Sequence, residues 1–157
     1  MNPASERGIP ALTMVNARVE TTRAPDGSPL VQAVFDLSEA EVAAVARAVN
    51  VSRTEQFRHE ELSADGVVAM RELTALADEM TALAGHGSAV TLMLRPARLV
   101  ALRDTLEAFV AHRDEAGFTR EEDRQAYAVA QALAWPLGDL SAETLRAALD
   151  AAAHADH

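Results

Sequence analysis

Apolar and polar residues alternate over residues 15–19 and again over 30–37. A period of two is the spacing of a strand that buries one face, so both segments are predicted to be strands. The residues between them, 24–29, have the sequence Ala-Pro-Asp-Gly-Ser-Pro. An Asp-Gly pair tolerates a positive φ, and proline restricts its own φ, which favours a turn. The pattern therefore predicts an N-terminal β-hairpin.

Beyond the hairpin, apolar residues recur at intervals of three and four, which is the spacing of one helix face. Two stripes with this spacing consist of Leu73, Leu76, Met80 and Leu83, and of Leu99, Leu102, Leu106 and Phe109. Residues 88–95 lie between the two stripes and alternate again, with Met93 on the face opposite its apolar neighbours. This segment is predicted to be a third strand.

Helix boundaries are marked by residues that satisfy the free backbone groups of helix ends. Capping boxes, in which Ser or Thr is followed three residues later by Glu, occur at 38–41, 52–55 and 119–122, and each predicts a helix start. Pro96 suits the first turn of the helix that carries the second stripe. Gly85 is expected to end the preceding helix in the left-handed conformation.

A proline predicts a break near the C-terminus. Pro136 has no N–H and is expected to end a helix near Trp135, and Ser141 is expected to open a separate last helix. Leu140 and Leu145 are placed for a hydrophobic staple at that start. The apolar face predicted for the last helix consists of Leu145, Ala148 and Leu149.

These elements predict an α+β fold, in which a small, mainly antiparallel sheet of about three strands is covered by about five helices. The N-terminal hairpin and one later strand supply the sheet, and helices dominate. Residues 11–153 are expected to form one domain between a flexible tail at 1–10 and a frayed tail at 154–157. A strand-helix-helix order over 30–84 and again over 88–153 allows an internal duplication. Chance recurrence of Ala-Leu helices is the alternative.

The composition excludes several kinds of chemistry. The 157 residues include no cysteine, which rules out disulfides, thiol nucleophiles and sites built on cysteine ligands. All 14 residues counted as Lys or Arg are arginine, so a P-loop and a lysine Schiff base are ruled out as well. Arginine without lysine, beside many alanines, is typical of a GC-rich bacterial genome.

The charge and hydropathy of the chain restrict its partners. A formal net charge of −10 makes nucleic acid an unfavourable partner, although arginines over 95–103 leave that as a weaker hypothesis. No apolar run reaches the ~18 residues of a membrane span, and residues 1–10 lack the apolar stretch of a secretory signal. We therefore expect a cytoplasmic protein that does not bind membranes. Its acidic surface would suit a basic protein partner.

Histidine and carboxylate spacing gives no recognised metal motif. No glutamate precedes a histidine by three residues, and His-Glu-x-x-His is absent. Glu55 and His59, and likewise His112 and Glu115, are spaced to share a helix face, and the two pairs could meet in the folded chain. Ordinary surface pairing is the alternative, and neither a metal nor a cofactor is predicted. The acidic run 121–123 is explained by its place at a helix start, so no catalytic residue is predicted.

Arg95, Arg98 and His86 are the candidate ligand-binding or anion-binding residues. Arg95 and Arg98 lie at a predicted helix start, where free N–H groups attract phosphate or carboxylate. Ion pairing with Asp104, Glu107 or another acidic element is the alternative. His86 lies between two glycines, which could present its imidazole for acid–base chemistry or could simply form a turn.

The first function hypothesis is a non-enzymatic regulatory or protein-interaction domain with an apolar groove between helices and an acidic rim. The eight residues of the two stripes are then the candidate interface residues, either against another protein or across the twofold axis of a homodimer. Ordinary core packing is the alternative for both stripes. An exposed edge of the predicted sheet offers a second route to a homodimer.

The second hypothesis is a small-molecule-binding protein or a cofactor-free enzyme, with a pocket between the helices and the sheet. The polar residues expected to line such a pocket are His86, Arg95, His112 and Tyr127. A ligand-sized cavity with converging polar groups would favour this hypothesis. A solid core with an exposed leucine patch would favour the first.

Overall fold

The computed structural model describes residues 15–59, 64–117 and 120–155. Its strands are β1 (Val15–Arg23), β2 (Pro29–Leu37) and β3 (Val90–Leu94). Its helices are α2 (Glu39–His59), α3 (Ala64–Gly85), α4 (Pro96–Ala116) and α5 (Glu121–Ala155). The predicted tail at 1–10 lies outside the described residues.

The three strands form one antiparallel sheet in the order β1-β2-β3, so β2 is central. This confirms the predicted α+β fold, with a small antiparallel sheet made from a hairpin and one later strand and with helices dominating. The alternation along β3 also agrees with the prediction, because Leu92 and Leu94 are buried whereas Met93 is 52% exposed.

Asp36 of β2 links all three strands. Its carboxylate accepts hydrogen bonds from the hydroxyl of Thr91 in β3 (2.6 Å) and from the side-chain amide of Asn16 in β1 (2.8 Å). These hydrogen bonds favour the charged form and hold the pKa of Asp36 below its ordinary value. Asn16 has a φ of 60°, and the register between β1 and β2 shifts beside it. The strict alternation predicted over 15–19 is therefore interrupted.

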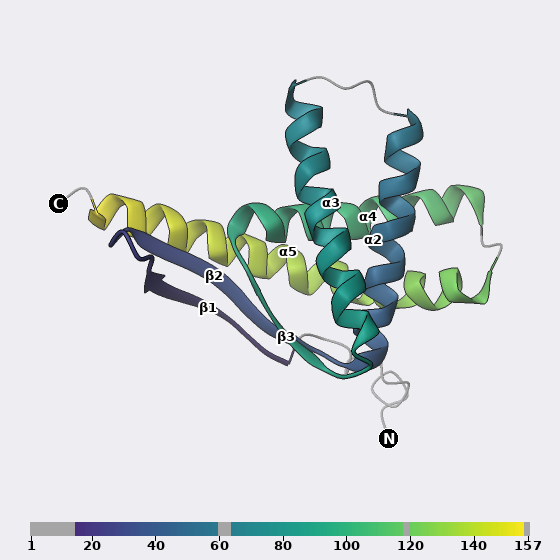
Figure 1. The fold of residues 1–157 in the computed structure, drawn as a ribbon, viewed down its shortest axis with the longest axis horizontal. Helices are drawn as coiled ribbons and strands as arrows, with labels where there is room; N and C mark the ends of the chain where they lie inside the picture. The colour runs from purple at the N-terminus through teal and green to yellow at the C-terminus, as the bar shows by residue number, and fades with distance from the viewer. Residues whose placement is uncertain (1–14, 60–63, 118–119, 156–157) are drawn as a thin grey trace.

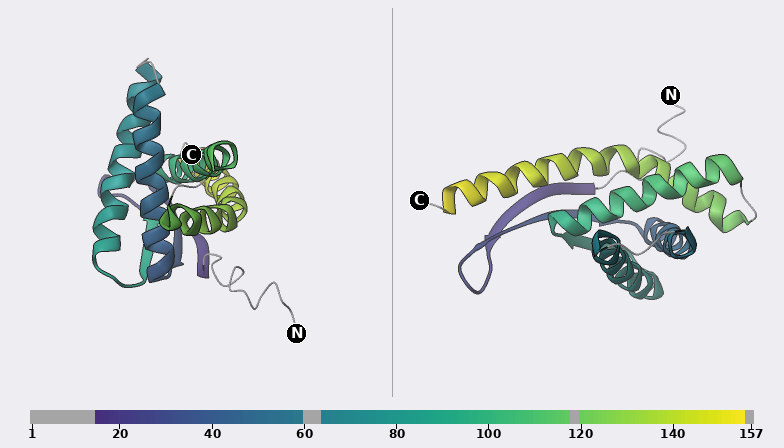
Figure 2. Two further views of the ribbon diagram at one scale, coloured as in Figure 1. Left: turned by 90° about the vertical axis from the view of Figure 1, so that its right-hand side faces the viewer. Right: turned by 90° about the horizontal axis from the view of Figure 1, so that it is seen from above.

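The helices pack on each other and on the sheet (Figure 1). Helix α5 lies along β2 and β1, and α4 runs beside α5. Helices α2 and α3 lie side by side as a pair that projects from this layer, as Figure 2 also shows. Residues from β2, β3 and all four helices form one core cluster.

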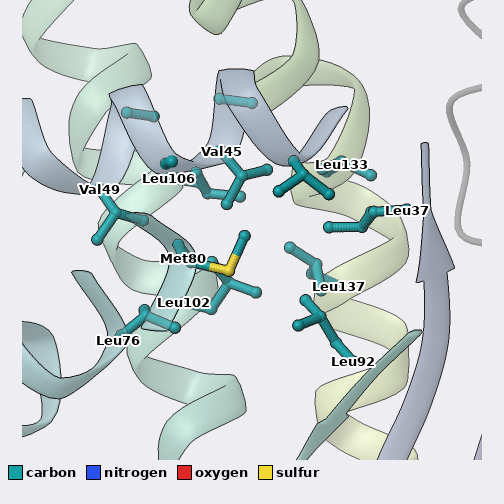
Figure 3. Packing of buried hydrophobic residues seen from close by; sticks show 14 of the residues in the cluster. Leu37, Val45, Val49, Leu76, Met80, Leu92, Leu102, Leu106, Leu133 and Leu137 are labelled. Atoms are coloured by element: carbon teal, nitrogen blue, oxygen red, sulfur yellow. The ribbon is translucent and has the colours of Figure 1, made fainter. Parts of the chain in front are cut away.

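Seven of the eight residues in the two predicted stripes are buried in this core, and Leu83 is half-buried against it. In Figure 3, Met80 of α3 lies among side chains from other elements, including Leu102 of α4, Leu137 of α5 and Val49 of α2. Within one copy of the chain, the two stripes therefore pack as ordinary core.

The start of α2 is the capping box that the sequence predicts. The Ser38 N–H donates to the Glu41 carboxylate (2.7 Å), and the Glu41 N–H donates to the Ser38 hydroxyl (3.2 Å). Pro96 stands in the first turn of α4, also as predicted. The end of α3 differs, because the helix includes Gly85 and the positive φ, 64°, belongs to Gly87.

The described residues form four helices rather than about five, because two predicted boundaries lie inside helices. Ser52 lies within α2, and its buried hydroxyl donates to the carbonyl oxygen of Thr105 in α4 (3.3 Å). The box at 52–55 therefore links two helices instead of starting one. Pro136 lies within α5, which continues to Ala155. His154 is consequently helical, in a segment predicted to fray.

Helix α5 continues through Pro136 because both of its flanks are buried. Leu133 precedes the proline, Leu137 and Leu140 follow it, and all three lie in the core. Burial of each leucine contributes about 2 kcal/mol, whereas proline inside a helix costs about 3 kcal/mol. The sum of the burial terms exceeds the cost of the proline.

Ser141 does not cap a helix. It is buried in the middle of α5, and three residues later the Thr144 hydroxyl donates to the carbonyl oxygen of Leu140 (2.6 Å). The predicted staple is also wrong, because Leu140 is buried and Leu145 is exposed.

The element order β-α-α occurs twice, as β2-α2-α3 and as β3-α4-α5. The first run spans residues 29–85 and the second spans 90–155. The final helices differ in length, with 22 residues in α3 and 35 in α5. An internal duplication stays a prediction.

No helix in the described part of the chain combines the length and the apolar character needed to cross a bilayer.

Replacing Pro136 with alanine tests this account of α5. Alanine restores an N–H to the helix interior, so we expect Pro136→Ala to raise the free energy of unfolding by about 1–3 kcal/mol. The matched control is Pro96→Ala in the first turn of α4, where proline suits the helix. This variant is expected to lower the free energy of unfolding by about 0.4–1 kcal/mol. Urea denaturation followed by circular dichroism measures both. A destabilised Pro136→Ala variant would contradict a continuous α5.

Candidate functional site

Among the helix residues whose side chains the structure describes, the largest exposed apolar side chains all belong to α5. Trp135 is 80% exposed, Leu149 71% and Leu145 45%. We define the α5 stripe as the set that continues their spacing along the helix, namely Trp135, Gly138, Ala142, Leu145, Leu149 and Ala152.

The members of the α5 stripe follow one another at intervals of three and four residues. Seven residues make almost two helical turns, so Trp135, Ala142 and Leu149 lie along one side of α5. The stripe is exposed along its length except at Gly138, which is partly covered. The Cδ atom of Arg103 in α4 would lie 3.9 Å from a β-carbon placed on Gly138.

The opposite side of α5 carries the core residues, which include Ala126, Ala130, Leu133, Leu137 and Leu140. Helix α5 therefore has two apolar sides, one that packs on the sheet and α4 and one that faces solvent. Single exposed apolar residues are common on protein surfaces, but a continuous row is not.

The surroundings of the α5 stripe contain both charge signs. A hollow of about 390 Å³ lies beside Trp135 and Gly138, and Arg103 and Glu107 of α4 contribute to its lining. On α5 itself, the exposed residues Asp139, Glu143, Arg146 and Asp150 lie next to the stripe. The stripe is thus an apolar row flanked by charged residues. Protein interfaces combine an apolar centre and a polar rim in the same way.

A second feature is an ion-pair network that joins α2, α4 and α5. The Glu55 carboxylate lies 2.6 Å from a guanidinium nitrogen of Arg113 and 2.8 Å from the Nε2 atom of His112. The Asp123 carboxylate lies 2.8 Å from Arg47 and 3.8 Å from Arg113. The side chains of Arg113 and Asp123 are only 10% and 5% exposed. Arg113 also stacks over the Phe109 ring, with 5.6 Å to the centroid.

The network brings Glu55 and His112 together, as one of the sequence alternatives suggested. Both carboxylates of the network already pair with arginine. Their negative charge is therefore balanced, and the network attracts a metal cation only weakly. Among the described residues, no group of three or more His, Cys, Asp or Glu side chains is arranged to hold a metal ion. The side chain of His59 lies outside the described residues.

A hollow of about 480 Å³ opens beside this network, and it is lined by Arg47, Asn50, Thr54, Glu55 and other residues. Two of its charged groups are paired, because Arg47 binds Asp123 and Glu55 binds Arg113, and Arg120 contributes a further cation to the lining. These two pairs join helices, which gives them a structural role.

The candidate anion-binding arginines lie where α4 begins, next to a hollow of about 480 Å³. Arg98 is paired with two glutamates of α3, at 2.6 Å from Glu72 and 3.4 Å from Glu79. These are ion pairs to another acidic element, as the alternative expected. Arg95 is exposed at the N-cap position and makes no side-chain capping hydrogen bond.

The polar residues expected in a common pocket lie on separate parts of the fold. His86 is exposed in the turn after α3. His112 binds Glu55, as described above. The Tyr127 hydroxyl donates to the Asp114 carboxylate (2.6 Å), and this hydrogen bond raises the pKa of Tyr127 above its ordinary value. The structure therefore does not bring these residues together in one cavity.

Two features of the structure are not predicted from the sequence. The acidic run 121–123 is predicted to serve the helix start through capping and the helix dipole, yet Asp123 is buried between Arg47 and Arg113. Leu145 and Leu149 were identified as an apolar face, but their alignment with Trp135 was missed because Pro136 was expected to end the helix. Heptad spacing across the proline was the signal that could have revealed it.

No protein-family model matches the chain, and neither a curated protein nor a solved structure matches it.

The ion-pair network can be tested with Asp123→Asn, which removes the charge between two arginines while keeping the size of the side chain. Loss of one partner of a buried ion pair leaves the others unpaired, so we expect a loss of about 3 kcal/mol in the free energy of unfolding. Glu121→Gln, two residues away in an exposed pair, is the matched control and is expected to change it by less than about 0.5 kcal/mol. Equal effects in urea denaturation would show that the network does not stabilise the fold.

Proposed function

We propose that the protein is a non-enzymatic protein-interaction module and that the α5 stripe is its binding surface. The observation that carries the proposal is the alignment of Trp135, Leu145 and Leu149 on the solvent side of a helix whose other side is core. Covering such a row with a partner would remove apolar area from water, which is the main driving force of association.

The position of the stripe supports this role. Helix α5 is held at its start by the Arg47–Asp123 ion pair and in its middle by buried leucines, so the stripe is presented by a rigid element. A surface that is already ordered loses little conformational entropy on binding. Aromatic residues such as Trp135 are also common at the centres of interfaces.

The alternative function is small-molecule binding. The hollow beside Arg47 and Glu55 is the observation that favours it, because polar side chains converge there. The pairing of Arg47 with Asp123 and of Glu55 with Arg113 weighs against it, as does the separation of His86, Arg95, His112 and Tyr127. The exposed leucine patch, in contrast, is the feature expected for an interaction module.

Photo-crosslinking can test the proposed surface. A benzoylphenylalanine placed at Leu149 is expected to cross-link to a protein in an extract of the source organism, because this position lies on the stripe. The same label at Asp150, which is exposed but lies off the stripe, is the matched control and is expected to give little adduct. Mass spectrometry of the adducts identifies the partner.

Absence of a protein adduct at position 149 would contradict the proposal, as would equal labelling at positions 149 and 150. Adduct formation only when the small-molecule fraction of the extract is present would favour the alternative. A basic protein in the adduct would agree with the acidic charge of the chain.

A further inference from the structure

We infer that the α5 stripe binds the α5 stripe of a second copy of this chain, with the two helices antiparallel and Ala142 at the twofold axis. The inference rests on the proposed function, because it names the partner of the same surface. It is carried by the register of apolar, small and charged residues along α5.

The apolar residues are placed symmetrically about Ala142. Trp135 lies seven residues before it, and Leu149 lies seven residues after it. In an antiparallel pair centred on Ala142, Trp135 of each copy therefore faces Leu149 of the other. Trp135 and Leu149, the two most exposed large apolar side chains of α5, cover each other twice in such a dimer.

The small residues fall where the helices must come closest. Ala142 would meet its own counterpart at the axis, and an alanine pair allows a short distance between helix axes. Gly138 would face Leu145 of the second copy, since these residues lie four before and three after Ala142. A large side chain opposite a residue without one is the arrangement that interlocking helices require.

The charged neighbours of the stripe are complementary in the same register. Asp139 lies three residues before Ala142, and Arg146 lies four residues after it. Both are exposed on the same flank of the stripe, so Asp139 of each copy comes within one residue of Arg146 of the other. The symmetric dimer thus gains two ion pairs across its rim.

A parallel arrangement of the same helices lacks this complementarity. It would place Trp135 against Trp135. Because its twofold axis runs along the helices, Asp139 and Arg146 of one copy would lie on the opposite side of the interface from those of the other, so that no ion pair forms across the rim. Beside Gly138, the antiparallel pair would also contact the Arg103 side chain of α4, which partly covers this end of the stripe.

The absence of natural cysteines allows a direct test with single-cysteine variants of the full chain. A disulfide needs Cα atoms about 4.4–6.8 Å apart. Under a mild oxidant, we expect Ala142→Cys to form a disulfide-linked dimer. Trp135→Cys and Leu149→Cys are each expected not to form a linked homodimer. In the antiparallel pair, position 135 faces position 149 of the other copy, so two copies of the same position lie about 21 Å apart along the helix. An equimolar mixture of these two variants is expected to form the linked heterodimer.

The matched control is Glu143→Cys, which is exposed next to Ala142 but lies off the stripe and is expected to stay unlinked. Self-linking of Trp135→Cys or of Leu149→Cys would indicate a parallel pair and would overturn the inference. Equal linking of Ala142→Cys and Glu143→Cys would show random collision and would overturn it as well.

Charge reversal provides a second measurement that needs no cross-link. Asp139→Arg and Arg146→Asp are each expected to weaken the dimer about tenfold or more in sedimentation equilibrium, because each creates two like-charge contacts. The double variant D139R/R146D is expected to restore the dimer. Asp150→Arg, which changes the charge off the stripe, is the control and is expected to weaken it much less.

These outcomes separate the inference from the proposed function. A natural chain that is monomeric at all concentrations, yet cross-links from position 149 to a different protein, would overturn the second-copy assignment and leave the interaction surface standing. A dimer that Leu149→Asp does not weaken would place the interface elsewhere and overturn the inference. If position 149 cross-links to no protein, both the second-copy assignment and the proposed interaction surface are overturned.

Discussion

Helix α5 is a single helix through Pro136, and the function that we propose depends on this continuity. The leucines on both sides of the proline are buried against the sheet and α4, and their burial outweighs the hydrogen bond that proline removes. Because the helix is not broken, Trp135 before the proline and Leu149 after it keep a fixed rotation about one axis. Two separate helices would point these side chains independently, and no continuous apolar row would exist.

The two ends of α5 are held by different forces. At its start, Asp123 is buried between arginines of α2 and α4, so the helix is positioned by directional ion pairs. Such pairs contribute little net stability when formed, but they are costly to break, which makes them effective at fixing one arrangement. Further along, apolar packing on β2 and β1 takes over, and the side of the helix away from the sheet is left uncovered. The same helix is therefore anchored at one end and exposed along its outer side.

Features that depend on neighbours in sequence could be predicted. The hairpin, the capping box at Ser38 and the exposed position of Met93 all follow from local spacing, and the structure agrees with each.

Features that depend on tertiary packing could not be predicted from the sequence. Ser52 has the sequence of a helix cap, yet it contacts Thr105 of another helix. Pro136 has the chemistry of a helix break, yet burial on its flanks decides the outcome. Glu55 and His112 could be named as candidates, but only the fold brings them together.

The same limit explains why the interface candidates changed. Apolar residues at intervals of three and four occur in α4 and in the C-terminal half of α5, and the spacing alone does not say which row faces the core. The row in α4 is buried, whereas Leu145 and Leu149 are exposed. The difference arises because α5 already packs on the sheet through another side, and a single helix cannot turn two sides toward one core. A helix with two apolar sides needs two partners. The first is the rest of the chain, and the symmetry of the second side about Ala142 favours another copy of α5.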